Sequence, residues 1–246
     1  MRLPDEPTKG NVTLQDLRLL IYGPPKIGKT TLASGFPNAL FLATEKGYAR
    51  FSVHVIDITS WTKFQEAVNL ITTSKHKFKF IVIDTLDVLF SLCVSSICMK
   101  LKIDHLSDEG YGKGYDMAAK EFEKWINKLF IAPYGFIGIS HTKVNEVFSR
   151  SGKISKIVPT LPNSARKIII PKVSTIGYMD MSPIEIRPGK FRERHVISFE
   201  PSEILEAGDR DGKLPQKFVV PEDPAETYKI FRNAYQSSER KEGRKM

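Results

Sequence analysis

The sequence predicts an α/β fold with a mainly parallel central sheet. Apolar segments of strand length, such as 38–43, 53–58 and 80–84, alternate along the chain with segments of helical periodicity. In this order each helix crosses the sheet and returns the next strand parallel to the last, with right-handed connections. The 246 residues, 41% hydrophobic and 26% charged, are ordinary for a globular domain. Two further strands in 173–199, separated by Pro188-Gly189, predict a C-terminal β-hairpin extension.

The first apolar segment, 17–22, is followed by a pattern typical of phosphate-binding loops. Residues 23–30 read G-x-x-x-x-G-K-T. Glycines let the backbone N–H groups turn toward a phosphate, and Lys29 places its ammonium at the start of a helix, beside the β- and γ-oxygens. Thr30 offers a hydroxyl to Mg²⁺. The expected ligands are therefore ATP and Mg²⁺, and the expected nucleotide-binding residues are Gly23, Pro24, Pro25, Lys26, Ile27, Gly28, Lys29, Thr30 and Thr31.

Two carboxylates follow later strands of the expected sheet. The apolar run 80–83 ends in Asp84, and a strand buried on both faces would deliver this carboxylate to the Mg²⁺ shell, so Asp84 joins Thr30 as a metal residue. Glu45 follows the strand at 38–43, where a carboxylate could orient the attacking water. The alternative for Glu45, a surface residue of a turn, remains open at this point.

A further buried strand begins at Gly135 and ends in the polar residues Ser140 and His141. Ligands bind at the carboxyl ends of strands in such sheets, so both side chains could sense a γ-phosphate and report its presence to the residues that follow. A lone histidine is usually structural, but its place at this strand end favours a functional role for His141.

The net charge of +9 is unevenly placed along the chain. Residues 143–194 hold eleven basic and four acidic residues. A polyanion is the natural partner for such a segment, although ATP also needs positive charge and a basic surface can be merely solvated.

Two polar segments could contact nucleic acid. Residues 107–116 interleave glycines with aromatic and basic residues, as in a mobile loop that clamps a strand, or as in a plain linker. Residues 144–164 form a long polar stretch that we expect to be a loop, and long loops in compact domains are usually functional or disordered. The candidate DNA-binding residues are Tyr111, Lys113, Tyr115, Arg150, Lys153 and Lys156.

The chain ends are expected to be appendages of one main domain. The predicted division is an N-terminal arm at 1–16, an ATPase domain at 17–215, and a C-terminal helix with a basic tail at 216–246, in which 223–236 is helical and 237–246 disordered. The N-terminus lacks the apolar region of a signal peptide, and no apolar run approaches the roughly 20 residues that span a bilayer. With two cysteines on different faces of a helix, the expected location is the reducing cytoplasm.

Taken in order, these motifs resemble the RecA-type ATPases encoded by bacteriophages and associated with single-strand annealing and recombination. The likeness covers roughly residues 17–215 and rests on the phosphate loop, Thr-Glu-Lys-Gly at 44–47, Val-Ile-Asp-Thr at 82–85, Gly-Tyr-Gly-Lys-Gly-Tyr at 110–115 and Gly-Ile-Ser-His-Thr-Lys at 138–143. It implies a RecA-like P-loop core in which Asp84 is the acid of the metal shell and Glu45 the catalytic carboxylate. The two polar segments would then be DNA-binding loops.

The resemblance also implies partners. Arg210-Asp211-Gly212 looks like part of a motif by which one subunit of an oligomeric RecA-like ATPase reaches the γ-phosphate of its neighbour, so Arg210 is a candidate catalytic residue of a homo-oligomer. A solvated turn residue is the alternative. Single-stranded DNA is the expected substrate, and a single-strand-binding or replication protein a possible partner.

Two functions compete. The first is a DNA-dependent ATPase that acts on single strands during phage recombination, annealing or replication. The second is a DNA-annealing or loading module in which ATP only switches affinity and turnover is negligible. A small-molecule kinase is disfavoured because no Arg-rich lid segment is apparent.

Overall fold

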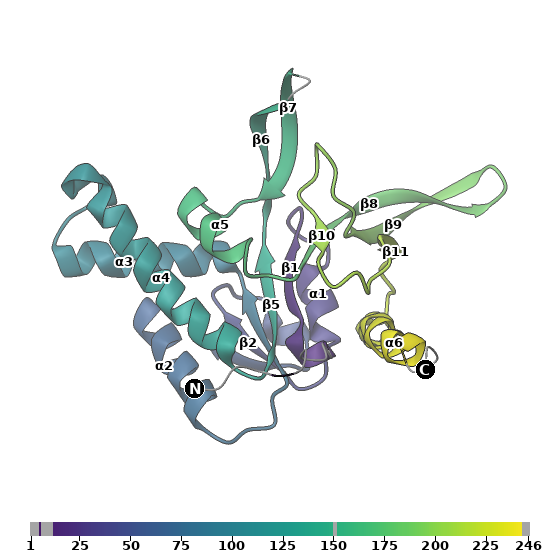
Figure 1. Ribbon diagram of the computed structural model, residues 1–246, viewed down its shortest axis with the longest axis horizontal. Coiled ribbons are helices and arrows are strands. Elements are labelled where there is room, and N and C mark those ends of the chain that lie inside the picture. The colour runs from purple at the N-terminus through teal and green to yellow at the C-terminus, as the bar shows by residue number, and fades with distance from the viewer. Residues whose placement is uncertain (1–4, 6–11, 150–151, 243–246) are drawn as a thin grey trace.

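A computed structural model describes residue 5 and residues 12–149 and 152–242. Its centre is a nine-stranded sheet in which eight strands follow the order β11-β9-β8-β1-β5-β4-β2-β3, while β10 pairs with β8 (Figure 1). The strands are β1 (Arg18–Tyr22), β2 (Ala39–Ala43), β3 (His54–Asp57), β4 (Phe80–Asp84), β5 (Gly135–Ser140), β8 (Thr175–Arg187), β9 (Lys190–Ser198), β10 (Gly208–Asp209) and β11 (Lys217–Val219).

Six neighbouring strands of the sheet, in the spatial order β8, β1, β5, β4, β2 and β3, are parallel. This confirms the predicted α/β fold with a mainly parallel sheet. β1 lies inside the sheet, between β5 and β8, and its last residue, Tyr22, is paired with Ser140 and Tyr178. Ala43 and Asp84, the last residues of β2 and β4, are paired in the same way. The carboxyl ends of these strands therefore meet at one edge of the sheet. β8 and β9 form the predicted C-terminal hairpin.

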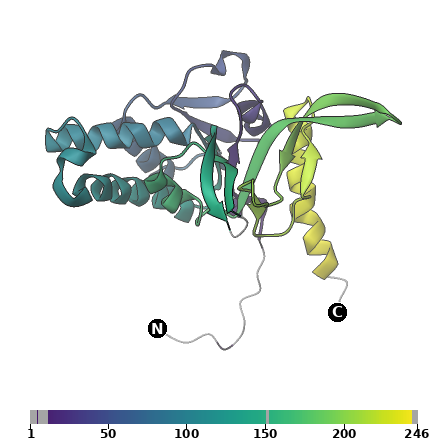
Figure 2. The same cartoon turned by 90° about the horizontal axis from the view of Figure 1, so that it is seen from above.

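Helices cover both faces of the sheet (Figures 1 and 2). One face carries α1 (Lys29–Ser34) and α6 (Pro224–Glu242), and the other carries α2 (Trp61–Thr73), α3 (Leu86–Leu101), α4 (Lys113–Ile131) and α5 (Asn163–Ile169). Single 3-10 turns lie at η1 (Leu14–Asp16), η2 (Tyr48–Arg50), η3 (Leu106–Asp108) and η4 (Gly110–Gly112). No helix in the described ranges is long and apolar enough to cross a membrane.

The two apolar layers follow from alternation along the strands. Leu19 and Ile21 of β1 pack under α1, whereas Leu20, between them, packs with the helices on the other face. Since helices bury both faces, the central strands are continuous apolar runs, as the sequence indicated. The C-terminal helix belongs to this core, because Phe231 of α6 packs edge-on against Phe36, just after α1.

The expected loop at 144–164 is mostly a β-hairpin, which corrects the prediction. β6 (Thr142–Ser149) and β7 (Gly152–Pro159) pair in antiparallel register and project from the carboxyl edge of the sheet (Figure 1). The hairpin is solvated over much of its length, so its strands carry polar residues between their β-branched ones and do not form the apolar runs that mark the central strands. Arg150, which stands between β6 and β7 in the sequence, lies outside the described residues.

Two smaller expectations also differ from the structure. Residues 107–116 are not an open loop, because η3, η4 and the first turn of α4 occupy most of them. A side-chain carbon at Gly114 would come within 2.4 Å of the Leu106 carbonyl oxygen, so this glycine permits close packing of α4 against η3. The tail predicted to be disordered continues α6 as far as Glu242, since residues 239–242 (Glu-Arg-Lys-Glu) are good helix formers. The predicted division at 16/17 and 215/216 stays a prediction.

Candidate active site

A cleft of about 430 Å³ opens at the carboxyl edge of the sheet. It is lined by the phosphate loop, by the segment after β2, and by the ends of β4 and β5. Five residues that the sequence singled out from four separate segments, Lys29, Thr30, Glu45, Asp84 and His141, all line it. The fold therefore brings these five nucleotide, metal and catalytic candidates together.

The phosphate loop joins β1 to α1 with two residues in the left-handed backbone region. Lys26 has φ of 64° and Gly28 has φ of 97°, and Gly28 is the N-cap of α1. Gly23 meets a different constraint, because a side-chain carbon there would lie 2.3 Å from the carbonyl oxygen of Met179 in β8. The first glycine of the motif thus permits close contact between the loop and the neighbouring strand.

Lys29 is buried at the centre of the loop, only 6% exposed. Its Nζ donates to the carbonyl oxygens of Gly23 and Pro24, at 2.8 Å each. Burial lowers the pKa of Lys29, and the nearby carboxylates, with Asp84 the strongest, oppose this shift. A desolvated ammonium held in a glycine-rich turn is suited to binding phosphate oxygens.

Two hydroxyl groups converge on Asp84. Thr30 Oγ1 and the phenol of Tyr48 each donate to Asp84 Oδ2 at 2.7 Å. Burial raises the pKa of Asp84, while the two hydrogen bonds lower it. A threonine hydroxyl beside a carboxylate is an oxygen donor pair that suits Mg²⁺, which takes its remaining ligands from water and phosphate. The described residues contain no cluster of three or more His, Cys, Asp or Glu side chains that could hold a metal ion.

Glu45 faces the cleft with its side chain 44% exposed. Its Oε1 accepts a hydrogen bond from Thr85 Oγ1 at 3.3 Å and lies 3.5 Å from His141 Nε2. The hydrogen bond from Thr85 holds one oxygen of this solvent-accessible carboxylate in place. Such a carboxylate can accept a proton from a water molecule in the cleft.

His141 is positioned by Asp87, a residue that sequence reasoning missed. Asp87 Oδ2 accepts from the backbone N–H of His141 at 2.9 Å, and Oδ1 accepts from Ser140 Oγ at 2.8 Å. Burial raises the pKa of Asp87, and these two hydrogen bonds oppose the shift. Ser140 is fully buried and does not line the cleft, so of the two suggested sensors only His141 can meet a ligand there.

The sequence contains a signal for Asp87 but none for Tyr48. Asp87 follows Asp84 by three residues in the first turn of α3, so a second carboxylate next to a predicted metal acid was a usable signal. Tyr48 follows Gly47 in a short turn after Glu45, and its contact with Asp84 depends on the pairing of β2 with β4. No local pattern shows that pairing.

A second cavity, also about 430 Å³, lies on the other side of the phosphate loop. Lys26, Gly28, Thr31 and Arg50 line both spaces, so the two meet along the loop. The second cavity is otherwise walled by β9 and by the start of α6, where Thr227 Oγ1 is buried without a partner among the described residues. Together the two cavities offer room for more than a phosphate group.

The candidate DNA-binding residues do not gather in one place. Lys113 and Tyr115 lie in the first turn of α4, and the backbone of Tyr111 lies in η4. This region is at the far end of α3, whose 16 residues extend about 24 Å from the cleft. Lys153 and Lys156 lie instead on the β6–β7 hairpin (Figures 1 and 2).

Arg210 lies at the opposite edge of the sheet from the cleft. Its backbone N–H donates to the carbonyl of Ser174, before β8 begins, and its side chain donates to the carbonyl of Pro171 at 2.9 Å. Arg210 therefore does not reach the cleft of its own chain, and contact with the cleft of a neighbouring copy stays a prediction.

A parallel sheet with a glycine-rich phosphate loop, a buried lysine and a Thr–Asp oxygen pair defines a P-loop nucleotide-binding domain. The family comparison agrees. The chain belongs to the AAA_24 family, described as an AAA domain, whose model matches residues 15–210. No curated protein matches the sequence significantly. The family and the site together make this protein a P-loop ATPase.

Proposed function

We propose that this protein hydrolyses ATP with Mg²⁺ while acting on single-stranded DNA, in phage recombination, annealing or replication. The observation that carries the proposal is the direct connection between the nucleotide cleft and the basic hairpin. His141 lines the cleft, and β6 begins at the next residue, Thr142. At the other end of the hairpin, the N–H of Thr160 donates to the carbonyl of His141 at 2.9 Å. A shift of His141 would therefore move both ends of the hairpin.

The roles of the residues follow from their places in the cleft. Lys29 and the N–H groups at the start of α1 bind the phosphate chain, and Thr30 and Asp84 would hold Mg²⁺, which neutralises charge on the phosphate oxygens. Glu45 accepts the proton of the attacking water. His141, next to Glu45, responds to the presence of the γ-phosphate. The second cavity gives space for the base and ribose of a nucleotide.

The proposed setting is the cytoplasm, that of the host if the protein is phage-encoded, with a homo-oligomer as the working form. Arg210 supports the oligomer because its guanidinium is exposed on the surface and is therefore accessible to a neighbouring copy. A single-strand-binding or replication protein is a further proposed partner. The high basic charge of residues 143–194 supports a polyanion as the substrate.

The decisive experiment measures phosphate release from ATP with and without single-stranded DNA, at matched salt and Mg²⁺. The proposal expects hydrolysis that DNA accelerates. A protein that binds ATP and DNA without measurable turnover would instead be the annealing or loading module in which ATP acts as a switch. A protein that hydrolyses ATP but does not bind single-stranded DNA at low salt would contradict the proposed substrate.

A further inference from the structure

The β6–β7 hairpin has two chemically different faces. Residues directly opposite each other in an antiparallel pair share a face, and successive residues alternate between faces. Phe148 is opposite Lys153, and Glu146 lies on the same face, where its carboxylate forms an ion pair with Lys153 at 2.6 Å. Asn145 is opposite Lys156, on the other face. The two lysines predicted together as DNA contacts thus point to opposite sides of the hairpin.

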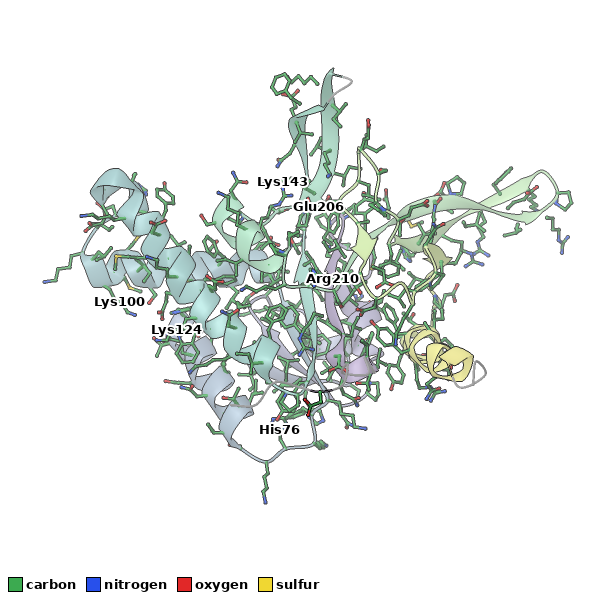
Figure 3. All side chains as sticks on the ribbon, viewed as in Figure 1. His76, Lys100, Lys124, Lys143, Glu206 and Arg210 are labelled. Atoms are coloured by element: carbon green, nitrogen blue, oxygen red, sulfur yellow. The ribbon has the colours of Figure 1, made fainter. Side chains whose placement is uncertain are left out.

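The face that carries Asn145 and Lys156 is turned toward α5. Asn145 and Val147 of β6 line a groove of about 420 Å³, whose other wall is made by Arg166, Lys167 and the segment that ends α5. Lys143, labelled with Glu206 in Figure 3, lies on the same hairpin face, nearer the sheet. The groove therefore runs between two elements from the most basic part of the chain.

Most of the basic side chains in and beside the groove have no acidic partner among the described residues. Glu206 is the acidic side chain in its lining, and it is already paired with Arg166. Lys143, Lys156 and Lys167 have no ion-pair partner among the described residues. Lys167 lines the groove itself, while Lys143 and Lys156 lie beside it, on the hairpin face that carries Asn145. An extended ligand along the groove and this face would meet three ammonium groups and a neutralised Arg–Glu pair, which favours an anion with several charges.

The remaining lining suits a flexible nucleic-acid strand. Asn145 and Asn163 supply amide groups that can both donate and accept hydrogen bonds, while Val147, Ile170 and Pro171 supply apolar surface. Sites that bind a single strand without strong sequence preference combine a positively charged groove that follows the backbone with aromatic side chains on which the bases stack. In the described part of the chain, the lining of this groove supplies positive charge but no aromatic ring, so the backbone is the part of the strand that it suits. The opposite face lacks this arrangement, since its one lysine is engaged by Glu146.

We propose that the groove between β6–β7 and α5 binds the backbone of single-stranded DNA, with Lys143, Lys156 and Lys167 contacting phosphates. This inference rests on the proposed function and makes it specific, because it assigns the DNA path to one face of the hairpin. Compared with the DNA-binding residues expected from the sequence, the proposal adds Lys143 and Lys167 and removes Lys153. The path adjoins β6, which begins immediately after His141, and so lies next to the segment that leaves the nucleotide cleft.

The test compares charge-neutral variants on the two faces. Binding of a fluorescein-labelled 30-nucleotide oligo-dT is followed by anisotropy across a salt series for the wild type, for K156Q/K167Q and for K153Q. Each lost phosphate contact should reduce the log–log salt slope by about 0.7, which is about fivefold in affinity at 0.1 M salt. K156Q/K167Q should then bind about 25-fold more weakly, with a slope lower by about 1.4, while K153Q retains the wild-type slope. Thermal melts confirm that each variant is folded.

The outcomes separate this proposal from the function on which it rests. If a folded K156Q/K167Q protein kept the wild-type slope and affinity, the groove would not be the DNA site, although DNA would remain the proposed substrate. The same conclusion would follow if K153Q lost as much affinity as the double variant. Absence of oligo-dT binding by the wild type at 50 mM salt would overturn the DNA substrate itself. A 30-base-pair duplex that binds as tightly, with the same dependence on Lys156 and Lys167, would overturn the assignment to a single strand.

Discussion

Replacing Glu45 with glutamine tests the catalytic assignment most directly. Glutamine has the same shape, and its Oε1 can still accept the hydrogen bond from Thr85 Oγ1, so the local structure should persist. The substitution removes one negative charge from the cleft that would hold the triphosphate. ATP affinity should therefore stay the same or rise, whereas proton transfer from the attacking water loses its acceptor.

The expected size of the effect follows from the other carboxylates near the cleft. Asp84 is engaged by Thr30 and Tyr48, and Asp87 is engaged by the residues at the end of β5. Neither is free to replace Glu45 as a proton acceptor. Loss of a general base typically costs 10²–10⁴-fold, so kcat should fall by about 10²-fold or more, equivalent to about 2.7 kcal/mol in the activation barrier.

The assay pairs two measurements on the same preparations. Steady-state phosphate release gives kcat, and titration with a fluorescent ATP analogue gives Kd, for the wild type, E45Q and E66Q. Glu66 is an exposed residue of α2 outside the cleft, so E66Q controls for the loss of one carboxylate. A kcat for E45Q within about twofold of wild type would refute the base assignment. A loss of ATP affinity in step with kcat would show that Glu45 has a structural role.

Three other substitutions test the site more briefly. Lys29→Ala should abolish binding of the fluorescent ATP analogue, and normal ATPase activity in a variant shown to be folded by circular dichroism would contradict the phosphate-loop assignment. Asp87→Ala removes two hydrogen bonds to a carboxylate, each worth about 1.5–3 kcal/mol, so the free energy of unfolding in urea should fall by about 3 kcal/mol, and less for Asp87→Asn. If Arg210 acts in trans, Arg210→Ala and Lys29→Ala proteins, each inactive alone, should regain partial ATPase activity when mixed. Wild-type turnover by Arg210→Ala alone would exclude that role.

The parts of the fold that were predictable are those with a local signal. The phosphate loop has fixed spacing, and strands buried on both faces are short apolar runs, so their order predicted the parallel sheet and the edge at which Glu45, Asp84 and His141 meet. Each of these residues ends a strand or follows one within two residues, and parallel strands present their carboxyl ends together. The geometry of the cleft was thus implied by three strand ends and one loop.

The parts that were missed depend on contacts distant in sequence. Asp87 stands out in the sequence as a second carboxylate near Asp84, but its contact with His141 follows only once α3 is known to start beside the end of β5. The sequence predicts a loop at 144–164 in place of the β6–β7 hairpin because the hairpin strands are solvated, so polar and apolar residues do not alternate regularly along them. The opposite directions of Lys153 and Lys156 follow from the register of that hairpin, which composition does not contain.

The packing of α6 against α1 has a consequence for how the chain is made. Phe36, just after the phosphate-loop helix, is covered by Phe231, 195 positions later in the sequence. At a synthesis rate of about 5–20 residues per second, α6 is synthesised roughly 10–40 s after α1, the helix that it covers. During that time a ribosome-bound chain exposes the apolar face that α6 later buries. The nucleotide site is therefore among the first parts of the protein to be synthesised and among the last to be completed.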